Sequence, residues 1–187
     1  MAGKRNLDTG TIMAAAAELV EETSFEELTL NTLATRLGVK PPSLYNHVTG
    51  IDDVRRGLAD LVAARMSAAI QTAAVGRSED EALTQMAHAY RKFATGHPEL
   101  YRAFLSARQL GADSSLSLVA DTLRRVLTAY HLSATDEDNF IRIFHSGLYG
   151  FTALTNLGVF ATGVDASFDA LVEGLLATLH TMCEATL

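Results

Sequence analysis

Side chains that could hydrogen-bond to a nucleic acid are concentrated in one stretch near the N-terminus, from Lys40 to His47. Ser43 can donate to a phosphate or to a base edge, and Asn46 can pair with the edge of an adenine. Tyr45 and His47 can reach backbone oxygens, while Lys40 supplies a positive charge where a phosphate passes. Residues of these types at this spacing predict contacts to double-stranded DNA.

A helix-turn-helix pattern predicts how these side chains are positioned. Residues 30–37 have leucines at helical spacing, and Thr29 before them is a suitable N-cap. Gly38 can adopt the positive φ that ends a helix. Pro42 suits the opening turn of a new helix, where its missing N–H group would have had no partner, so we expect a short helix over 42–47. In such a motif the N-terminal residues of the second helix touch base edges in the major groove.

The rest of the chain also shows helical rather than strand periodicity. Only three prolines interrupt it, long runs consist of good helix formers, and no long stretch alternates apolar and polar residues. We therefore expect an all-α fold. The further helices are expected near residues 9–22, 51–74, 79–95, 98–108, 114–130, 136–158 and 166–185.

Composition limits the kind of protein. The chain has 187 residues, 48% of them hydrophobic, which is enough for a proper core. A net charge of −7 argues against attraction to nucleic acid or anionic membrane through bulk charge, so any DNA contact must be local. The single cysteine, Cys183, excludes an intrachain disulfide and suits a reducing compartment. Since no signal-peptide pattern and no long apolar window is present, we expect a soluble cytoplasmic protein without membrane partners.

No catalytic or cofactor motif is present in the sequence. It contains no phosphate-binding loop, dinucleotide fingerprint, zinc-protease motif or nucleophile elbow. His180 and Cys183 are spaced acceptably for metal ligands, but a buried cysteine acting as a small apolar residue is the favoured interpretation. We therefore expect no enzyme activity, no cofactor and no metal site.

The stretch LTLNTLATRLGVKPPSLYNHV, residues 28–48, resembles the DNA-binding domain of the TetR family of bacterial repressors. The resemblance implies a three-helix DNA-binding head over 1–50, joined by a long helix to a helical regulatory and dimerisation domain over 51–187. It also implies a homodimeric, sequence-specific transcriptional regulator, a repressor that a small apolar effector releases from a palindromic operator. On this head the expected DNA contacts are Thr29, Lys40, Pro42, Ser43, Tyr45, Asn46 and His47.

A second resemblance lies downstream, in FHSGLYGFTALTNLGVF, residues 144–160. This stretch is similar to the signature of the WHG-type regulatory domain found in one branch of the family. Leu148-Tyr149-Gly150 occupies the positions of the name-giving triplet, of which the glycine is kept.

The stretch from Thr49 to Asp53 departs from the family's common pattern, in which one or two lysines follow the histidine. Positive charge that would bind phosphate is therefore missing at the start of the fourth helix. The sequence leaves open whether Arg55 and Arg56, one turn further on, replace that charge.

Aromatic and polar-tipped residues are frequent on the helices that surround the core in this family. His145 and Tyr149 are one turn apart and could supply the few polar groups that an apolar ligand cavity contains. An alternative is that these residues only fill the core. The expected ligand contacts are Phe93, Tyr101, Phe104, Phe144, His145 and Tyr149.

The last two helices are expected to form the homodimer. The final helix has a wide apolar stripe, which suits a four-helix interface between two copies. The residues of that stripe are Phe168, Leu171, Val172, Leu175, Leu176, Leu179 and Met182. An alternative function is a helical protein–protein interaction module with a degenerate head, but the intact stretch from Pro42 to His47 favours DNA binding.

Overall fold

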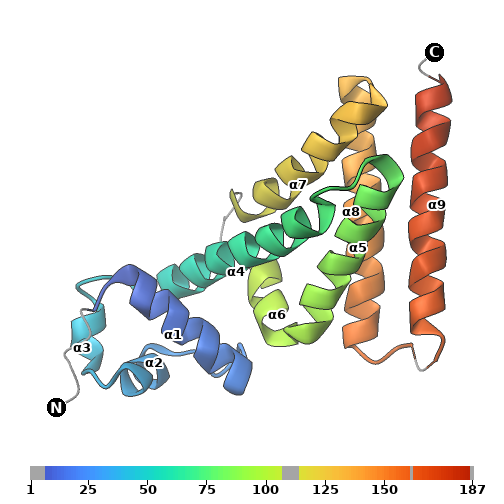
Figure 1. The fold of residues 1–187 in the computed structure, drawn as a ribbon. Coiled ribbons are helices and arrows are strands. Elements are labelled where there is room, and N and C mark those ends of the chain that lie inside the picture. Colours follow the sequence, from blue (N-terminus) through green and yellow to red (C-terminus); the bar gives the residue numbers. More distant parts are fainter. Residues whose placement is uncertain (1–6, 107–113, 161, 186–187) are drawn as a thin grey trace. The chain divides into compact units, whose positions relative to one another are not determined.

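The computed structural model describes residues 7–106, 114–160 and 162–185. Within these ranges the chain forms helices and no strands, which confirms the all-α prediction. None of those helices combines the length and apolarity that a bilayer crossing requires. The elements in Figure 1 are α1 (Thr9–Glu22), α2 (Leu30–Leu37), α3 (Pro41–Leu44), α4 (Ile51–Ala74), α5 (Glu79–Gly96), α6 (Pro98–Ser106), α7 (Ser114–Leu127), the 3-10 helix η2 (Thr128–Tyr130), α8 (Ala134–Asn156) and α9 (Val164–Ala185).

Several of these helices, α3, α5, α7, α8 and α9, differ from the sequence prediction by one to three residues at an end, and the predicted end of the helix over 98–108 lies outside the described residues. α3 ends at Leu44 instead of extending to residue 47, because the N–H groups of His47 and Val48 both turn back to the Leu44 carbonyl oxygen, at 2.9 and 3.0 Å. α8 begins two residues earlier than expected, because Ser133 caps it. The Ser133 hydroxyl oxygen accepts a hydrogen bond from the N–H of Asp136 at 3.1 Å.

The helices gather into two compact units. The first spans residues 1–64 and 97–115 and contains α1, α2, α3, the first part of α4, and α6. The second spans residues 65–96 and 116–187 and contains the rest of α4, α5, most of α7, α8 and α9. The chain passes between the units inside α4, at the break between α5 and α6, and near the start of α7. The functional boundary after residue 50 stays a prediction.

The core of the first unit includes a close approach between α1 and α4. A Cβ atom on Gly57 would lie 2.6 Å from the Sδ atom of Met13, so a larger residue at this position would displace the methionine. The fully buried side chains of this unit include Ile12, Ala16, Val20, Leu28, Leu33, Leu44, Val54 and Leu58.

In the second unit, α8 packs against both α5 and α9 (Figure 1). Phe168 of α9 is completely buried, and its ring centroid lies 5.3 Å from the ring centroids of both His88 and Phe151. The guanidinium of Arg91 lies over the same Phe168 ring at 4.9 Å. Aromatic and cation–π contacts therefore join α5, α8 and α9 at one end.

Four residues of the predicted apolar stripe of α9 are buried within their own unit, whereas Leu171, Leu176 and Met182 are half-buried. Phe168, Val172, Leu175 and Leu179 are at most 6% exposed, and a Cβ atom on Gly147 of α8 would lie 3.5 Å from Leu175 Cδ1. Interpreting these four residues as a dimer contact is therefore wrong. Periodicity shows which side of a helix is apolar, but not which surface covers it. The homodimer itself stays a prediction.

Candidate nucleic-acid interface

α2 is fixed at both ends by local hydrogen bonds. At its start the Thr29 hydroxyl oxygen accepts from the N–H of Thr32 at 3.1 Å, and the Thr29 N–H donates to the Thr32 hydroxyl oxygen at 3.0 Å, which completes a capping box. At its end Gly38 has φ +68°, a left-handed conformation, and the N–H of Val39 returns to the carbonyl oxygen of Ala34 at 3.0 Å. These bonds set the angle at which the chain leaves α2 for α3.

α3 is anchored by one buried side chain, and the polar residues directly after it are exposed. Leu44 is fully buried, and Val48 just beyond it is 3% exposed. Tyr45 between them is 60% exposed, which is high for an aromatic residue without a partner surface. A short helix that is anchored on one side and polar on the other suits insertion into a groove.

The structure places every predicted DNA contact on the same compact unit, at the start of α2 or on α3 and the residues directly before and after it. None of these side chains is buried. Ser43 is half-buried, and the exposed ones are Thr29, Lys40, Pro42, Tyr45, Asn46 and His47.

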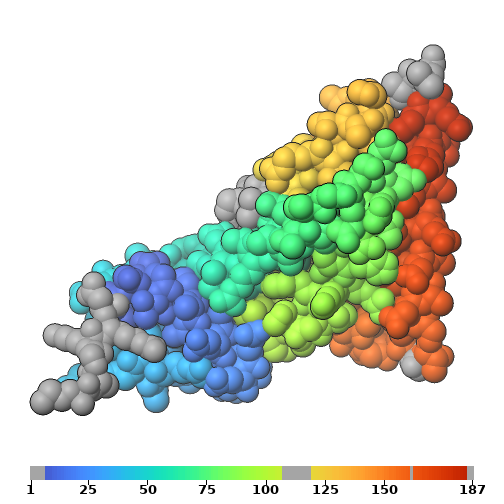
Figure 2. All heavy atoms as spheres, viewed as in Figure 1, coloured from blue at the N-terminus to red at the C-terminus, as the bar shows by residue number. Residues whose placement is uncertain are grey.

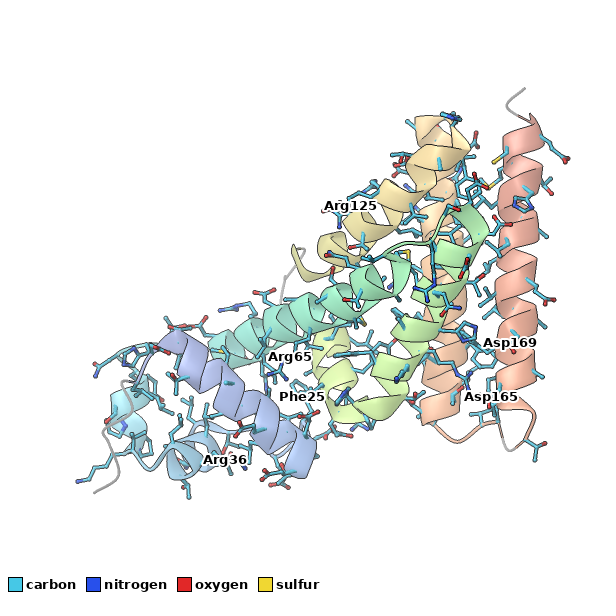
Figure 3. The ribbon with its side chains drawn as sticks, viewed as in Figure 1. Phe25, Arg36, Arg65, Arg125, Asp165 and Asp169 are labelled. Atoms are coloured by element: carbon cyan, nitrogen blue, oxygen red, sulfur yellow. The ribbon has the colours of Figure 1, made fainter. Side chains whose placement is uncertain are left out.

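Acidic residues of α1 are paired within the unit. Arg36 of α2, labelled in Figure 3, donates to a carboxylate oxygen of Glu22 at 2.7 Å and to one of Glu18 at 3.1 Å. These hydrogen bonds hold the pKa of Glu22 below its ordinary value and raise the pKa of Arg36. The two carboxylates are thus partly neutralised by a residue of the helix-turn-helix, which lowers repulsion between an acidic protein and phosphate.

Arg55 and Arg56 occupy different positions on α4. The Arg55 guanidinium lies 5.5 Å from the centroid of the Phe25 ring and 3.6 Å from Asp52, so its charge is engaged inside the unit. Arg56 pairs with Asp53 at 3.6 Å and its side chain is 42% exposed. Of the two, Arg56 is the more exposed, and whether either replaces the missing lysines stays a prediction.

Asp8 is a capping residue of this unit that sequence reasoning missed. Its carboxylate caps α1 by accepting from the N–H of Thr11 at 2.7 Å. Hydrogen bonds from Thr11 hold the pKa of Asp8 below its ordinary value. An aspartate directly before a helical run is a local capping signal that could have identified it.

The predicted ligand contacts are not gathered in one unit. Tyr101 and Phe104, with ring centroids 6.3 Å apart, belong to the first unit. In the second unit, Phe144 is buried and the half-buried His145 lies edge-on to Tyr90, with centroids 6.1 Å apart. The two remaining residues there are Phe93, which is half-buried, and Tyr149, which is 42% exposed.

Two family models match the chain. Residues 12–54 match the model of bacterial regulatory proteins of the tetR family, and residues 83–179 match the tetracyclin repressor-like C-terminal domain. A helix-turn-helix transcriptional regulator of Mycobacterium tuberculosis is 33% identical over 179 residues, which cover 93% of this chain and 82% of that protein. The chain belongs to the TetR family.

Solved structures of TetR-type regulators have the same fold as this chain. A TetR variant from Acinetobacter baumannii AYE in complex with minocycline has a TM-score of 0.74 at 25% identity, covering 97% of each chain. BioQ with its natural double-stranded DNA operator has a TM-score of 0.69 at 22% identity, covering 92% of this chain and 99% of that chain. The TetR-family member described here is a DNA-binding transcriptional regulator.

Proposed function

We propose that this regulator represses transcription by binding a near-palindromic operator as a homodimer, and that a small, largely apolar effector releases it. The observation that carries the proposal is the geometry of α3, in which buried Leu44 anchors a short helix, and the exposed Tyr45, Asn46 and His47 follow directly after it. A two-fold dimer places two such helices in successive major grooves, roughly 34–36 Å apart. Operator binding by BioQ supports the arrangement.

The proposed roles on DNA follow from exposure and chemistry. Ser43 and Asn46 contact bases or their immediate surroundings, since a hydroxyl and an amide can read donors and acceptors in the groove. Tyr45, His47 and Lys40 contact phosphates. Thr29 uses its hydroxyl oxygen in the capping box, so its main contribution is to hold the start of α2, which carries the site.

The proposed dimer face is the uncovered side of α8 and α9. Ile143 and Leu154 on α8 are 42% and 40% exposed, and nothing lies within 4 Å of a Cβ atom placed on Gly150 between them. Large exposed apolar side chains on one side of a helix are typical of a surface that another protein chain covers. The outer side of α9, red in Figure 2, is rich in small exposed residues that permit close approach, namely Ala166, Ala170, Gly174, Ala177 and Thr181.

The proposed effector site lies in the second unit, on the buried side of α8. Thr152 is fully buried, and its hydroxyl oxygen has no hydrogen-bond partner among the described residues. An unpaired buried hydroxyl is costly, so it marks a place where a ligand atom would be stabilised. His145 lies two turns earlier on the same helix. The complex of the TetR variant with minocycline supports a small-molecule effector.

Replacing Lys40 by alanine is expected to weaken binding to all DNA sequences alike, because the lost charge neutralises a phosphate. The slope of log affinity against log salt should fall by about one unit. Gel shifts on the DNA upstream of the protein's own coding sequence, from about 50 to about 200 mM salt, measure this slope. Lys92→Ala, which removes an exposed charge on α5, is the control and should change neither quantity.

An altered sequence preference with an unchanged slope would show that Lys40 contacts a base instead. If the wild-type protein gives no shift even at low salt, the protein-interaction module becomes the better function.

An effector identified by a thermal-shift screen of apolar compounds should lower operator affinity by the same factor by which operator lowers effector affinity. Thr152→Val removes the unpaired hydroxyl without changing side-chain volume much. We expect it to keep or raise the melting temperature of the free protein, and to weaken effector binding about tenfold.

Thr155→Val is the matched control, because the Thr155 hydroxyl already donates to the carbonyl oxygen of Phe151 at 2.9 Å. Calorimetry with the same compound measures the effector affinity of both variants, and only Thr152→Val should show a weaker affinity. Equal effector affinity in Thr152→Val and wild type would remove Thr152 from the site.

A further inference from the structure

α6 contacts the corner between α1 and α2, which lies in the same compact unit. The backbone N–H of Phe25, within that corner, donates to Oε2 of Glu99 at 2.9 Å, across 74 residues of sequence. The Glu99 side chain is only 23% exposed and pairs with Arg102 at 3.3 Å. A hydrogen bond to a carboxylate is stronger than one between neutral groups, and losing it leaves the amide without this acceptor.

Two ion pairs flank this hydrogen bond. Arg102 contacts Glu26 at 2.7 Å, and His97 contacts Glu21 at 2.5 Å. The side chains of both pairs are well exposed, so each pair alone contributes little. The two pairs connect the start of α6 with the end of α1 and with the corner after it. Of all these side chains, that of Glu99 is the least exposed.

Phe25 is also held by α4 and by its own turn. The Arg55 guanidinium lies over the Phe25 ring. The carbonyl oxygen of Phe25 accepts a hydrogen bond from the N–H of Leu28 at 3.3 Å. Leu28 is fully buried and directly precedes Thr29, the N-cap of α2. The backbone of Phe25 is thus linked through Leu28 to the capped start of α2, and α2 leads through the Gly38 turn into α3.

We infer that Glu99 is a positioning residue for DNA binding, acting from α6 through the Phe25 amide on the start of α2. The inference rests on the proposed function of α3. It assigns α6 to the DNA-binding machinery, although residues 83–179, which include it, match the C-terminal family model. Glu99 itself does not touch DNA in this assignment.

The test compares Glu99→Ala with Glu99→Gln. The glutamine keeps an acceptor oxygen for the Phe25 amide, whereas alanine removes it. We expect Glu99→Ala to bind the upstream DNA at least tenfold more weakly, with an unchanged salt slope and a melting temperature close to that of wild type. Glu99→Gln should restore most of the affinity. Amide hydrogen exchange over residues 23–29 should be faster in Glu99→Ala than in Glu99→Gln.

Glu99→Met, which keeps side-chain length and helix propensity but lacks the acceptor, replaces Glu99→Ala if the latter does not fold. Wild-type affinity and wild-type exchange in a folded acceptor-free variant would overturn the inference. If the wild-type protein itself binds no DNA, the proposed function fails. The exchange measurement still decides, independently of DNA, whether Glu99 fixes the corner.

Discussion

Replacing Ile143 and Leu154 together by glutamate is expected to convert the homodimer into a folded monomer that binds the operator at least a hundredfold more weakly. Both side chains are about two-fifths exposed and lie three turns apart on α8. In a single chain the two new carboxylates would be solvated. In a four-helix interface they would be buried without partners, next to their symmetry copies, which costs several kcal/mol.

Light scattering measures the mass, circular dichroism the helical content, and a gel shift the operator affinity of this variant. Lys92→Glu changes the net charge by the same −2 on the exposed side of α5 and serves as the control. A dimer that survives both glutamates would place the interface elsewhere. If the wild-type protein is monomeric at micromolar concentration, the prediction of a homodimer is wrong.

The second large effect is expected for Phe168→Ala, which should lower the free energy of unfolding by about 3–5 kcal/mol. The ring is completely buried and contacts His88, Phe151 and the guanidinium of Arg91. Removing it leaves a cavity where α9 meets α5 and α8, because three contacts converge on a single side chain. Urea unfolding followed by circular dichroism gives the value.

Phe160→Ala is the matched control. This ring also lies against Phe151, at 5.1 Å, but it is 36% exposed, so its loss should cost far less. The ion pair of Arg91 with Asp165, which lies near Asp169 in Figure 3, cannot compensate for Phe168, because the Asp165 side chain is 92% exposed. Equal losses in the two phenylalanine variants would show that Phe168 does not anchor α9.

Local signals carried most of the fold prediction. The bounds of α1 and α4 are those expected from the sequence, and the N-cap Thr29 and the left-handed Gly38 are where the residue types indicated. α3 was predicted too long. The residue types after Leu44 do not show that the N–H groups of His47 and Val48 both donate to the Leu44 carbonyl oxygen and close the helix there. Capping residues and glycines act within one turn of the chain, so a single sequence displays them.

Contacts between distant segments were not predictable in the same way. The stripe containing Leu175 was identified correctly as apolar but assigned to the wrong covering surface. The bond between Phe25 and Glu99 has no sequence signature, since a glutamate near a helix start has many uses. The division of the expected ligand contacts between two units likewise depends on packing that periodicity does not encode.

The close approach of Gly57 to Met13 links the two positions in evolution. The atoms that a Cβ on residue 57 would meet are the far end of a flexible side chain, so growth of residue 57 requires the methionine to change rotamer. Shortening residue 13 first would leave only a small void, which a larger residue 57 could then fill. The two positions are therefore expected to vary as a pair among relatives.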